Sequence, residues 1–116
     1  MLKVGTDIVE VSRFLDKEDS FLVSIFTSNE ILEGNKRQNK AEYYASRFAA
    51  KEAFAKTQEK AFSTIKARDI EIKNDSNGMP YISLSEEHSH LLANKNVTLS
   101  ISHEKTFAIA VVVVYA

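Results

Sequence analysis

One stretch of the chain, from Asn39 to about Gln58, constrains the fold more than any other. It contains neither Gly nor Pro and is rich in Ala, Tyr, Phe, Lys and Glu, a composition that favours a long helix. Asn39 can cap the first turn of this helix, and Glu42 can reach back toward the cap. At about 100° per residue, apolar side chains fall on two opposite sides. We therefore expect a helix that is covered on two sides.

Charged residues interrupt these apolar sides. Glu52 falls in the middle of one of them, and Lys56, four residues on, lies beside it. An unpaired buried carboxylate is costly, so Glu52 needs a partner. Either Glu52 and Lys56 form a helix pair that only satisfies itself, or Glu52 belongs to a metal or phosphate site. Arg47 and Lys51 form a second pair at the same spacing.

Composition bounds the class of protein. The chain has 116 residues, the usual size of one domain, and 44% of them are hydrophobic, which is enough for a core. It has no Cys, which excludes disulfides and thiolate metal sites. Its net charge of −1 gives no overall attraction to nucleic acid. The sequence has no signal-peptide pattern and no apolar run of membrane-spanning length, so we expect one cytoplasmic domain, residues 1–116, without a membrane or nucleic-acid partner.

Two further residues with functional chemistry stand near the ends of expected strands. Alternation from Leu2 onward predicts a first strand, with Asp7 near its end on the face that it shares with Gly5. A glycine there leaves open space beside the carboxylate. The alternative for Asp7 is a turn or helix-cap residue. His103 ends another alternating stretch, where a core role and a functional role are equally open.

The order of the expected elements predicts an α+β domain with a largely antiparallel sheet. A strand is followed by short helices, by the long helix, and then by four strands with one helix inserted among them. The last strand, Phe107 to Tyr115, is apolar on both faces. It is therefore either a central strand or a strand covered by another subunit. The other expected strands are 69–73, 81–84 and 97–103, and the expected short helices are 10–19, 28–34 and 86–94.

Several blocks of the sequence occur together in a characteristic order and spacing. They are Gly5 to Phe14, Phe26-Thr27 with Glu30, Arg47 to Lys56, Asn77 to Pro80, and Ser100 to Glu104. In this order the blocks resemble the holo-[acyl-carrier-protein] synthases, the small bacterial branch of the 4'-phosphopantetheinyl transferases. The block with Lys56 four residues after Glu52 is the most specific, and together the blocks span nearly the whole chain.

The resemblance implies a reaction and an assembly. Coenzyme A donates its 4'-phosphopantetheine arm to a serine of apo-acyl carrier protein in fatty acid biosynthesis, and 3',5'-ADP leaves. A divalent ion, magnesium or in its place manganese, holds the pyrophosphate. The implied fold is that of the 4'-phosphopantetheinyl transferases, with a largely antiparallel sheet packed on a long helix. The implied assembly is a homotrimer with active sites between subunits.

The resemblance also implies roles for individual residues. Asp7 and Glu52 are the metal-binding carboxylates, and Arg13 and Lys17 dock the acidic carrier protein. The proton of the acceptor serine can go to Glu52, to a metal-bound water or to His103, and the sequence leaves this choice open. The implied catalytic residues are Glu52, Lys56 and His103. The implied coenzyme A contacts are Arg47, Lys51, Lys56, Gly78, Pro80, Ser102 and His103.

The sequence departs from this family in two places. After Lys56 the family has a Gly-rich turn, whereas this chain reads Thr57 to Phe62 without a Gly. Acidic residues also dilute the basic character around Arg13 and Lys17. A catalytically silent module that binds coenzyme A or the carrier is therefore one alternative to the transferase. A trimeric scaffold without coenzyme A binding is another.

Overall fold

The computed structural model describes all 116 residues. A three-stranded antiparallel sheet has the order β1-β5-β4, and β2 and β3 form a separate antiparallel hairpin. The strands are β1 (Leu2–Glu10), β2 (Ile70–Asn74), β3 (Pro80–Leu84), β4 (Asn96–His103) and β5 (Phe107–Tyr115). The α-helices are α1 (Asp19–Val23), α2 (Ser28–Asn35) and α3 (Lys40–Ala55). Short 3₁₀ helices are η1 (Val11–Phe14), η2 (Ala61–Ser63), η3 (Ala67–Asp69) and η4 (Glu86–Leu92).

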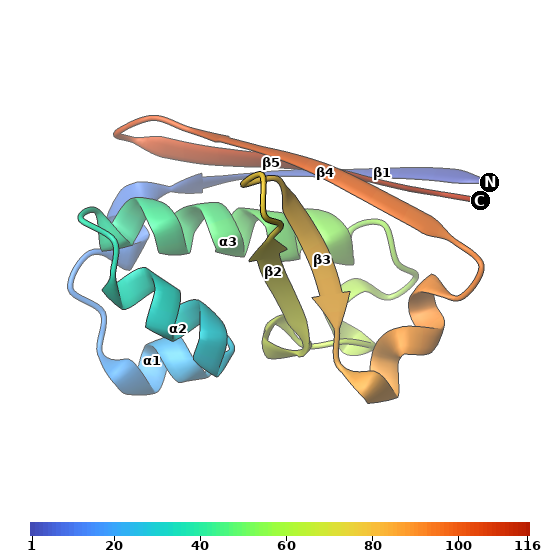
Figure 1. The fold of residues 1–116 in the computed structure, drawn as a ribbon, viewed down its shortest axis with the longest axis horizontal. Coiled ribbons are helices and arrows are strands. Elements are labelled where there is room, and N and C mark those ends of the chain that lie inside the picture. Colours follow the sequence, from blue (N-terminus) through green and yellow to red (C-terminus); the bar gives the residue numbers. More distant parts are fainter.

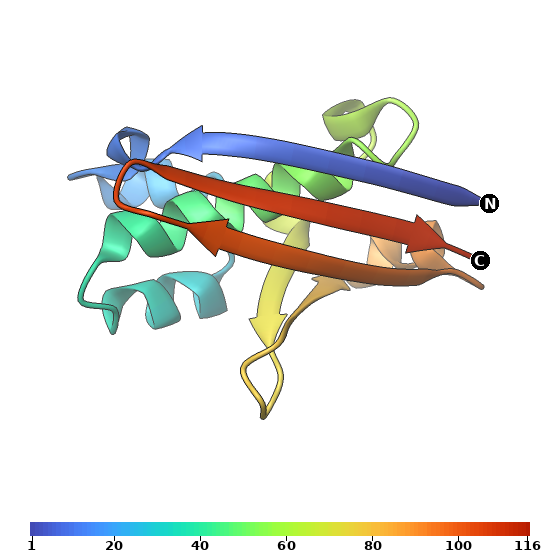
Figure 2. The ribbon, with the colours of Figure 1, turned by 90° about the horizontal axis from the view of Figure 1, so that it is seen from above.

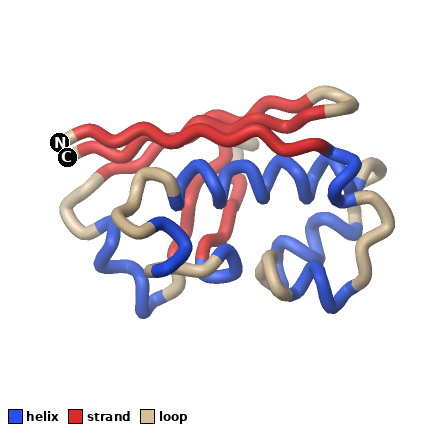
Figure 3. Tube along the Cα trace, turned by 180° about the vertical axis from the view of Figure 1, so that it is seen from behind, coloured by secondary structure: helices blue, strands red, loops and turns tan.

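Helix α3 lies between two layers. The sheet β1-β5-β4 covers one side of it, and the β2–β3 hairpin with α1 and α2 lies on the other (Figures 1 and 3). Seen from above, α3 runs beneath the sheet, and both chain termini lie at the same end (Figure 2). The prediction of an α+β fold with antiparallel strands is confirmed, and the 16-residue helix α3 is covered on two sides. The expected sheet is divided into two, because no hydrogen bonds join β3 to β4.

The start of α3 follows the prediction and its end does not. The Asn39 side chain accepts a hydrogen bond from the Glu42 backbone N–H at 3.1 Å, as expected of a cap. The Glu42 side chain does not return to the cap, and its Oε2 lies 3.6 Å from His103 Nδ1. The helix ends at Ala55, three residues before the predicted end, because the chain turns at Lys56.

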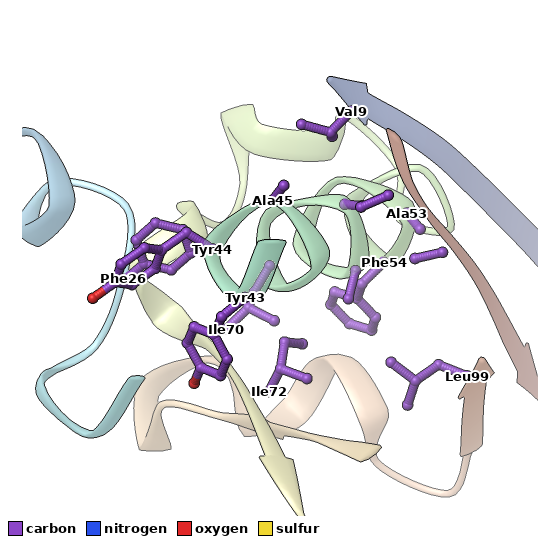
Figure 4. Packing of buried hydrophobic residues seen from close by; sticks show 14 of the residues in the cluster. Val9, Phe26, Tyr43, Tyr44, Ala45, Ala53, Phe54, Ile70, Ile72 and Leu99 are labelled. Atoms are coloured by element: carbon purple, nitrogen blue, oxygen red, sulfur yellow. The ribbon is translucent and has the colours of Figure 1, made fainter. Parts of the chain in front are cut away.

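The core forms on both sides of α3. Figure 4 shows Val9 of β1 and Ala53 of α3 on the side of the helix that faces the sheet, and Ile70 and Ile72 of β2 on the side of Tyr43. All five side chains are buried. Small residues on the helix let the sheet backbone come close, and this closeness sets the geometry of the site described below.

Strand β5 is central in its sheet, as one of the two interpretations of its sequence required. Its residues alternate between buried and more exposed positions, and only one face packs on α3. The opposite face stays apolar and exposed together with its neighbours on β1. We call this surface the outer sheet face. It comprises Leu2, Val4, Ile8, Phe107, Ile109, Val111 and Tyr115.

Two of the expected short helices were wrong in type. The segment expected as one helix over 10–19 is η1 followed by a turn at Asp16, where φ is 53°, and α1 begins only at Asp19. The segment over 86–94 is the 3₁₀ helix η4, which ends before Asn94, where φ is 60°. Left-handed backbone ends a helical run, and periodicity alone does not reveal it. None of the helices is long and apolar enough to span a membrane.

Candidate active site

A close approach of β1 to α3 builds the first group of functional residues. A Cβ atom on Gly5 would lie 1.9 Å from the carbonyl oxygen of Ala53, so only glycine fits where strand and helix meet. The open space expected beside Asp7 is therefore filled by the backbone of α3. Because Asp7 is two residues further on the same face of β1, its carboxylate lies at the end of α3 that carries Glu52 and Lys56.

Lys56 pairs with Asp7. Its Nζ atom lies 3.1 Å from Asp7 Oδ1 and donates a second hydrogen bond to the backbone oxygen of Thr6 at 2.9 Å. Glu52 takes part in no ion pair. The interpretation of Glu52 and Lys56 as a pair that satisfies itself is therefore wrong, and Glu52 has no ion-pair partner on its own helix.

The electrostatics of Glu52 suit a cation. Burial raises the pKa of its carboxyl, and the negative charge of Asp7 raises this pKa further. The positive charges of Lys56 and Arg13 act in the opposite direction but do not cancel the shift. Two nearby carboxylates offer the oxygen ligands that Mg²⁺ prefers, so the donor set fits such an ion.

A second group of functional residues lies near the other end of α3. Arg37, Glu42, Arg47 and His103 line a small cavity of about 180 Å³. The guanidinium carbon of Arg47 lies 4.5 Å from the centre of the Tyr43 ring, and that of Arg37 lies 5.0 Å from it. The Nε atom of Arg47 is buried and has no hydrogen-bond partner. Such an arrangement of cations suits an anionic ligand.

The tip of the β2–β3 hairpin adjoins this group. Arg47 donates a hydrogen bond to the side-chain oxygen of Asn74 at 3.3 Å, and Asn74 pairs with Pro80 across the hairpin. Gly78 has a φ of 83°, which only glycine adopts without strain, and no atom lies within 4 Å of its missing Cβ. The turn is therefore open at Gly78, and the small cavity described above lies beside Arg47. Ser102, on β4, is exposed and precedes His103.

Lys51 was misplaced by the sequence analysis. Its side chain is fully buried, and Nζ lies 2.7 Å from Glu30 Oε1. It also donates to the backbone oxygens of Ala67 and Ile70. An ammonium with three hydrogen bonds in the core is not available to a phosphate, so the expectation that Lys51 contacts coenzyme A is wrong. Burial also lowers the pKa of Lys51.

The two groups are well separated in one chain. His103 lies beside Glu42 and Asp7 beside Lys56, and these helix positions are 14 residues, or about 21 Å, apart at 1.5 Å per residue. The strands that carry them, β1 and β4, are the two edges of the sheet. One chain thus brings Asp7, Glu52 and Lys56 together but keeps His103 and Arg47 away from them.

Of the two basic residues expected to dock the carrier, Arg13 stands on the side of the first group, and Lys17 lines a cavity near the start of α3. Arg13, on η1, holds its guanidinium 5.4 Å from the centre of the Phe48 ring, one turn before Glu52 on α3. Lys17 holds its ammonium 5.4 Å from the centre of the Phe21 ring. Both side chains belong to exposed residues. Arg13 therefore reaches toward the carboxylate site, whereas Lys17 lies further along the loop before α1.

Two arrangements were missed by the sequence analysis. Glu30 completes the capping box of α2 with Thr27 and also pairs with Lys51, 21 residues later. The side chain of His88 is only 14% exposed, and its Nδ1 lies 2.8 Å from the Ser85 hydroxyl. Carboxylates of Asp69 and Glu87 lie close to His88. None of these contacts has a periodic signal in the sequence, because loops bring the residues together.

Comparison with known proteins gives the class first. The family model described as 4'-phosphopantetheinyl transferase superfamily matches residues 3–112. A crystal structure of holo-[acyl-carrier-protein] synthase from Neisseria meningitidis superposes with a TM-score of 0.84 at 32% identity, covering 98% of both chains. The fold and the sequence together define a 4'-phosphopantetheinyl transferase.

The particular family follows from the individual relatives. The holo-[acyl-carrier-protein] synthase of Halothermothrix orenii is 41% identical over 117 residues, which are 95% of this chain and 94% of that protein. The Helicobacter pylori synthase, solved in complex with coenzyme A, superposes with a TM-score of 0.81 at 31% identity over 96% of this chain and 98% of that one. The chain belongs to the holo-[acyl-carrier-protein] synthase family.

Proposed function

We propose that this enzyme transfers the 4'-phosphopantetheine arm of coenzyme A to a serine of an apo-acyl carrier protein, releasing 3',5'-ADP, as a magnesium-dependent step that serves fatty acid biosynthesis in the cytoplasm. The observation that carries the proposal is the meeting of Asp7, Glu52 and Lys56 at one end of α3 in a member of this family. The coenzyme A bound to the Helicobacter pylori relative supports the choice of donor.

Asp7 and Glu52 would hold the metal ion. A divalent cation at this position, Mg²⁺ or Mn²⁺, neutralises charge on the pyrophosphate of the donor. Lys56 stands beside the same carboxylates with its ammonium already oriented by Asp7 and by the Thr6 carbonyl. It is therefore ready to contact a phosphate oxygen and to stabilise or protonate the leaving 3',5'-ADP.

Glu52 is the residue that we favour for removing the proton of the acceptor serine, directly or through a water that it orients. A general base works best when its pKa lies near the working pH. In the metal-free protein, burial and then the charge of Asp7 raise the pKa of Glu52 above its ordinary value, whereas a bound cation would act in the opposite direction. His103 is the less favoured candidate, since its ring faces Glu42 near the other end of α3.

A homotrimer would join the two groups of residues. The outer sheet face is apolar, which favours a protein partner over water. Its β1 edge leads to Asp7, and the far edge of the sheet, β4, carries His103. A head-to-tail contact that closes into a ring of three sets one edge of a subunit against a different surface of the next. Each active site would then combine Asp7, Glu52 and Lys56 of one subunit with His103 of its neighbour.

The second group would bind the nucleotide part of coenzyme A. Arg47 and His103 supply positive charge or hydrogen bonds for phosphates, and the open turn at Gly78 and Pro80 gives room for the adenosine. Ser102 stands at the same strand end. Arg13, on the side of the carboxylates, and Lys17, near the start of α3, would dock the acidic carrier protein, since charge complementarity speeds association.

Mass spectrometry of the carrier tests the proposal directly. The protein is mixed with apo-acyl carrier protein, coenzyme A and MgCl₂, and the carrier is weighed. A gain equal to one phosphopantetheine arm is expected, and no gain in the presence of EDTA. An unchanged carrier mass with retained binding of coenzyme A would mean a silent binding module. Absence of both would leave only a scaffold.

The altered loop after Lys56 makes this test necessary. Lys60 and Ala61 adopt left-handed backbone, with φ of 65° and 44°, although neither is glycine. Such residues usually avoid this region, at a cost of about 1–2 kcal/mol each. The chain thus forms a turn there without the glycines of its family. If this turn had abolished catalysis, the carrier mass would not change.

A further inference from the structure

Glu30 and Lys51 form a fully satisfied ion pair in the core, outside the groups of residues used above. The side chains are 1% and 0% exposed, and Nζ lies 2.7 Å from Oε1. All three N–H groups of the ammonium have acceptors, namely Glu30 and the carbonyls of Ala67 and Ile70. The carboxylate also accepts from the backbone N–H groups of Thr27 and Ile72, each at 2.9 Å.

The pair occupies the open edge of β2. In an antiparallel ladder, alternate residues direct both backbone groups toward the partner strand or both away from it. The Ile70 carbonyl binds Lys51 and the Ile72 N–H binds Glu30, so these two groups face away from β3. The ion pair therefore stands where a neighbouring strand would be. It ties the two-stranded hairpin, which would be marginal alone, to α2 and α3.

The strand held in this way leads directly to the nucleotide end of the site. Asn74 follows Ile72 by two residues, about 7 Å along a strand, and receives the hydrogen bond from Arg47. The turn with Gly78 and Pro80 begins just after Asn74. Arg47 itself is on α3, one turn before Lys51. Arg47 on α3 and Asn74 on β2 thus border the same space, and the ion pair fixes the distance between these two elements.

We propose that the buried Glu30–Lys51 ion pair is a positioning device that holds the β2–β3 hairpin against α3 and so sets the affinity for coenzyme A. The inference rests on the proposed function. It assigns no chemistry to either residue, because both lie out of reach of any ligand. The ion pair should affect the binding of coenzyme A and not the rate of turnover, because Asp7, Glu52 and Lys56 do not touch the hairpin.

The test replaces both charges at once. Buried ion pairs exchanged for apolar side chains of similar size often leave stability unchanged, whereas removal of one partner strands the other charge. The double variant Glu30→Met with Lys51→Met leaves no charge without its partner, and it is expected to fold with reduced stability, because four backbone groups lose their hydrogen bonds to the pair. We expect its KM and its calorimetric Kd for coenzyme A to rise about tenfold, with kcat at saturating coenzyme A within about twofold of the wild type. The single variant Glu30→Gln, which keeps an acceptor for Ile72, should show a smaller rise in KM.

A control separates positioning from general destabilisation. Val114 is buried at the far end of β5, and Val114→Ala lowers stability without touching the hairpin. The two variants are compared at temperatures well below both melting points. The positioning role is overturned if the folded double variant has an unchanged KM for coenzyme A. It is also overturned if Val114→Ala raises this KM as much as the double variant does.

Two remaining outcomes are also decisive. If the double variant does not fold, Glu30→Gln decides by its KM, because that side chain is nearly the same shape, and an unchanged value overturns the inference. If the wild type neither binds nor consumes coenzyme A, the proposed function and this inference fall together. If the wild type binds and consumes coenzyme A but the double variant has an unchanged KM, the positioning role is refuted and the proposed function stands.

Discussion

Lys56 Nζ lies 3.1 Å from Asp7 Oδ1. The lysine therefore pairs with a carboxylate 49 residues away in the sequence and not with Glu52, which precedes it by only four residues. This pairing gives each of the three residues a different role. Asp7 orients Lys56, Lys56 offsets part of the local negative charge, and Glu52 stays without a bound partner. A site for a cation and a phosphate group needs such a surplus of carboxylate oxygen beside an ammonium.

Replacing Glu52 by Gln should abolish transfer while the fold remains. The substitution removes the charge and one carboxylate oxygen, so we expect kcat/KM to fall by about 10³-fold or more. MgCl₂ should raise the melting temperature of the wild type and leave that of Glu52→Gln unchanged. Glu86→Gln is the matched control, because Glu86 is exposed on η4, and it should behave as the wild type does. Full activity in Glu52→Gln would remove Glu52 from the mechanism.

The same variant should change the pH dependence of stability in metal-free buffer. Because the pKa of Glu52 is raised in the folded protein, the folded state binds more protons than the unfolded state between the two pKa values. The contribution of Glu52 to stability is therefore fully present below the unfolded pKa and is lost as pH rises through the folded pKa. We expect Glu52→Gln to be more stable than the wild type at pH 7, with the difference shrinking on acidification toward about pH 4. Urea unfolding at several pH values measures this, and a difference that grows on acidification would contradict it.

The contact of Gly5 with α3 predicts a large effect of one methyl group. A Cβ atom at this position would meet the Ala53 carbonyl at 1.9 Å, and neither backbone can yield without separating strand and helix. Gly5→Ala should lower the free energy of unfolding by about 3 kcal/mol or more and should also reduce transfer, because Asp7 moves away from Glu52. Gly78→Ala is the contrast, since its space is open and only its φ of 83° is strained, at about 1 kcal/mol. Urea unfolding of both variants measures whether Gly5→Ala lowers the free energy of unfolding more than Gly78→Ala does.

The sequence predicted the elements of this fold better than their contacts. The cap of α3, the capping box at Thr27 and Glu30, the alternation of β1 and β4 and the apolar run of β5 are local signals, and all are present. Pairing across long separations has no such signal. Lys51 carried the spacing of a surface pair with Arg47, yet burial against Glu30 decided its place. Lys56 had a local partner at ideal spacing, yet the close packing at Gly5 brought Asp7 nearer.

The outer sheet face predicts the effect of a single charge on assembly. Val111 is central on this face, and it lies opposite Thr6 of β1 and Ser100 of β4. If the face is covered in a trimer, Val111→Glu buries an unpaired carboxylate and should convert the trimer to monomers, as sedimentation velocity would show. Leu32→Glu, at a more exposed apolar residue on α2, should leave the assembly unchanged. A wild type that sediments as a monomer would contradict the proposed assembly itself.

Mixing two inactive variants tests whether each active site is shared between subunits. One variant carries Asp7→Asn, and the other carries Arg47→Ala with His103→Ala, so each lacks a different group of residues. If a site takes one group from each of two neighbours, random exchange of equal amounts leaves about one quarter of the sites intact in a closed ring. Transfer activity should therefore recover to about that fraction after the subunits are allowed to exchange. If each chain supplied a complete site, every site in the mixture would carry a defect and no activity would return. Asp7 lies beside Lys56 and His103 beside Glu42, and these helix positions are about 20 Å apart. No rotation of the two side chains spans this distance, so recovery of activity is the expected result.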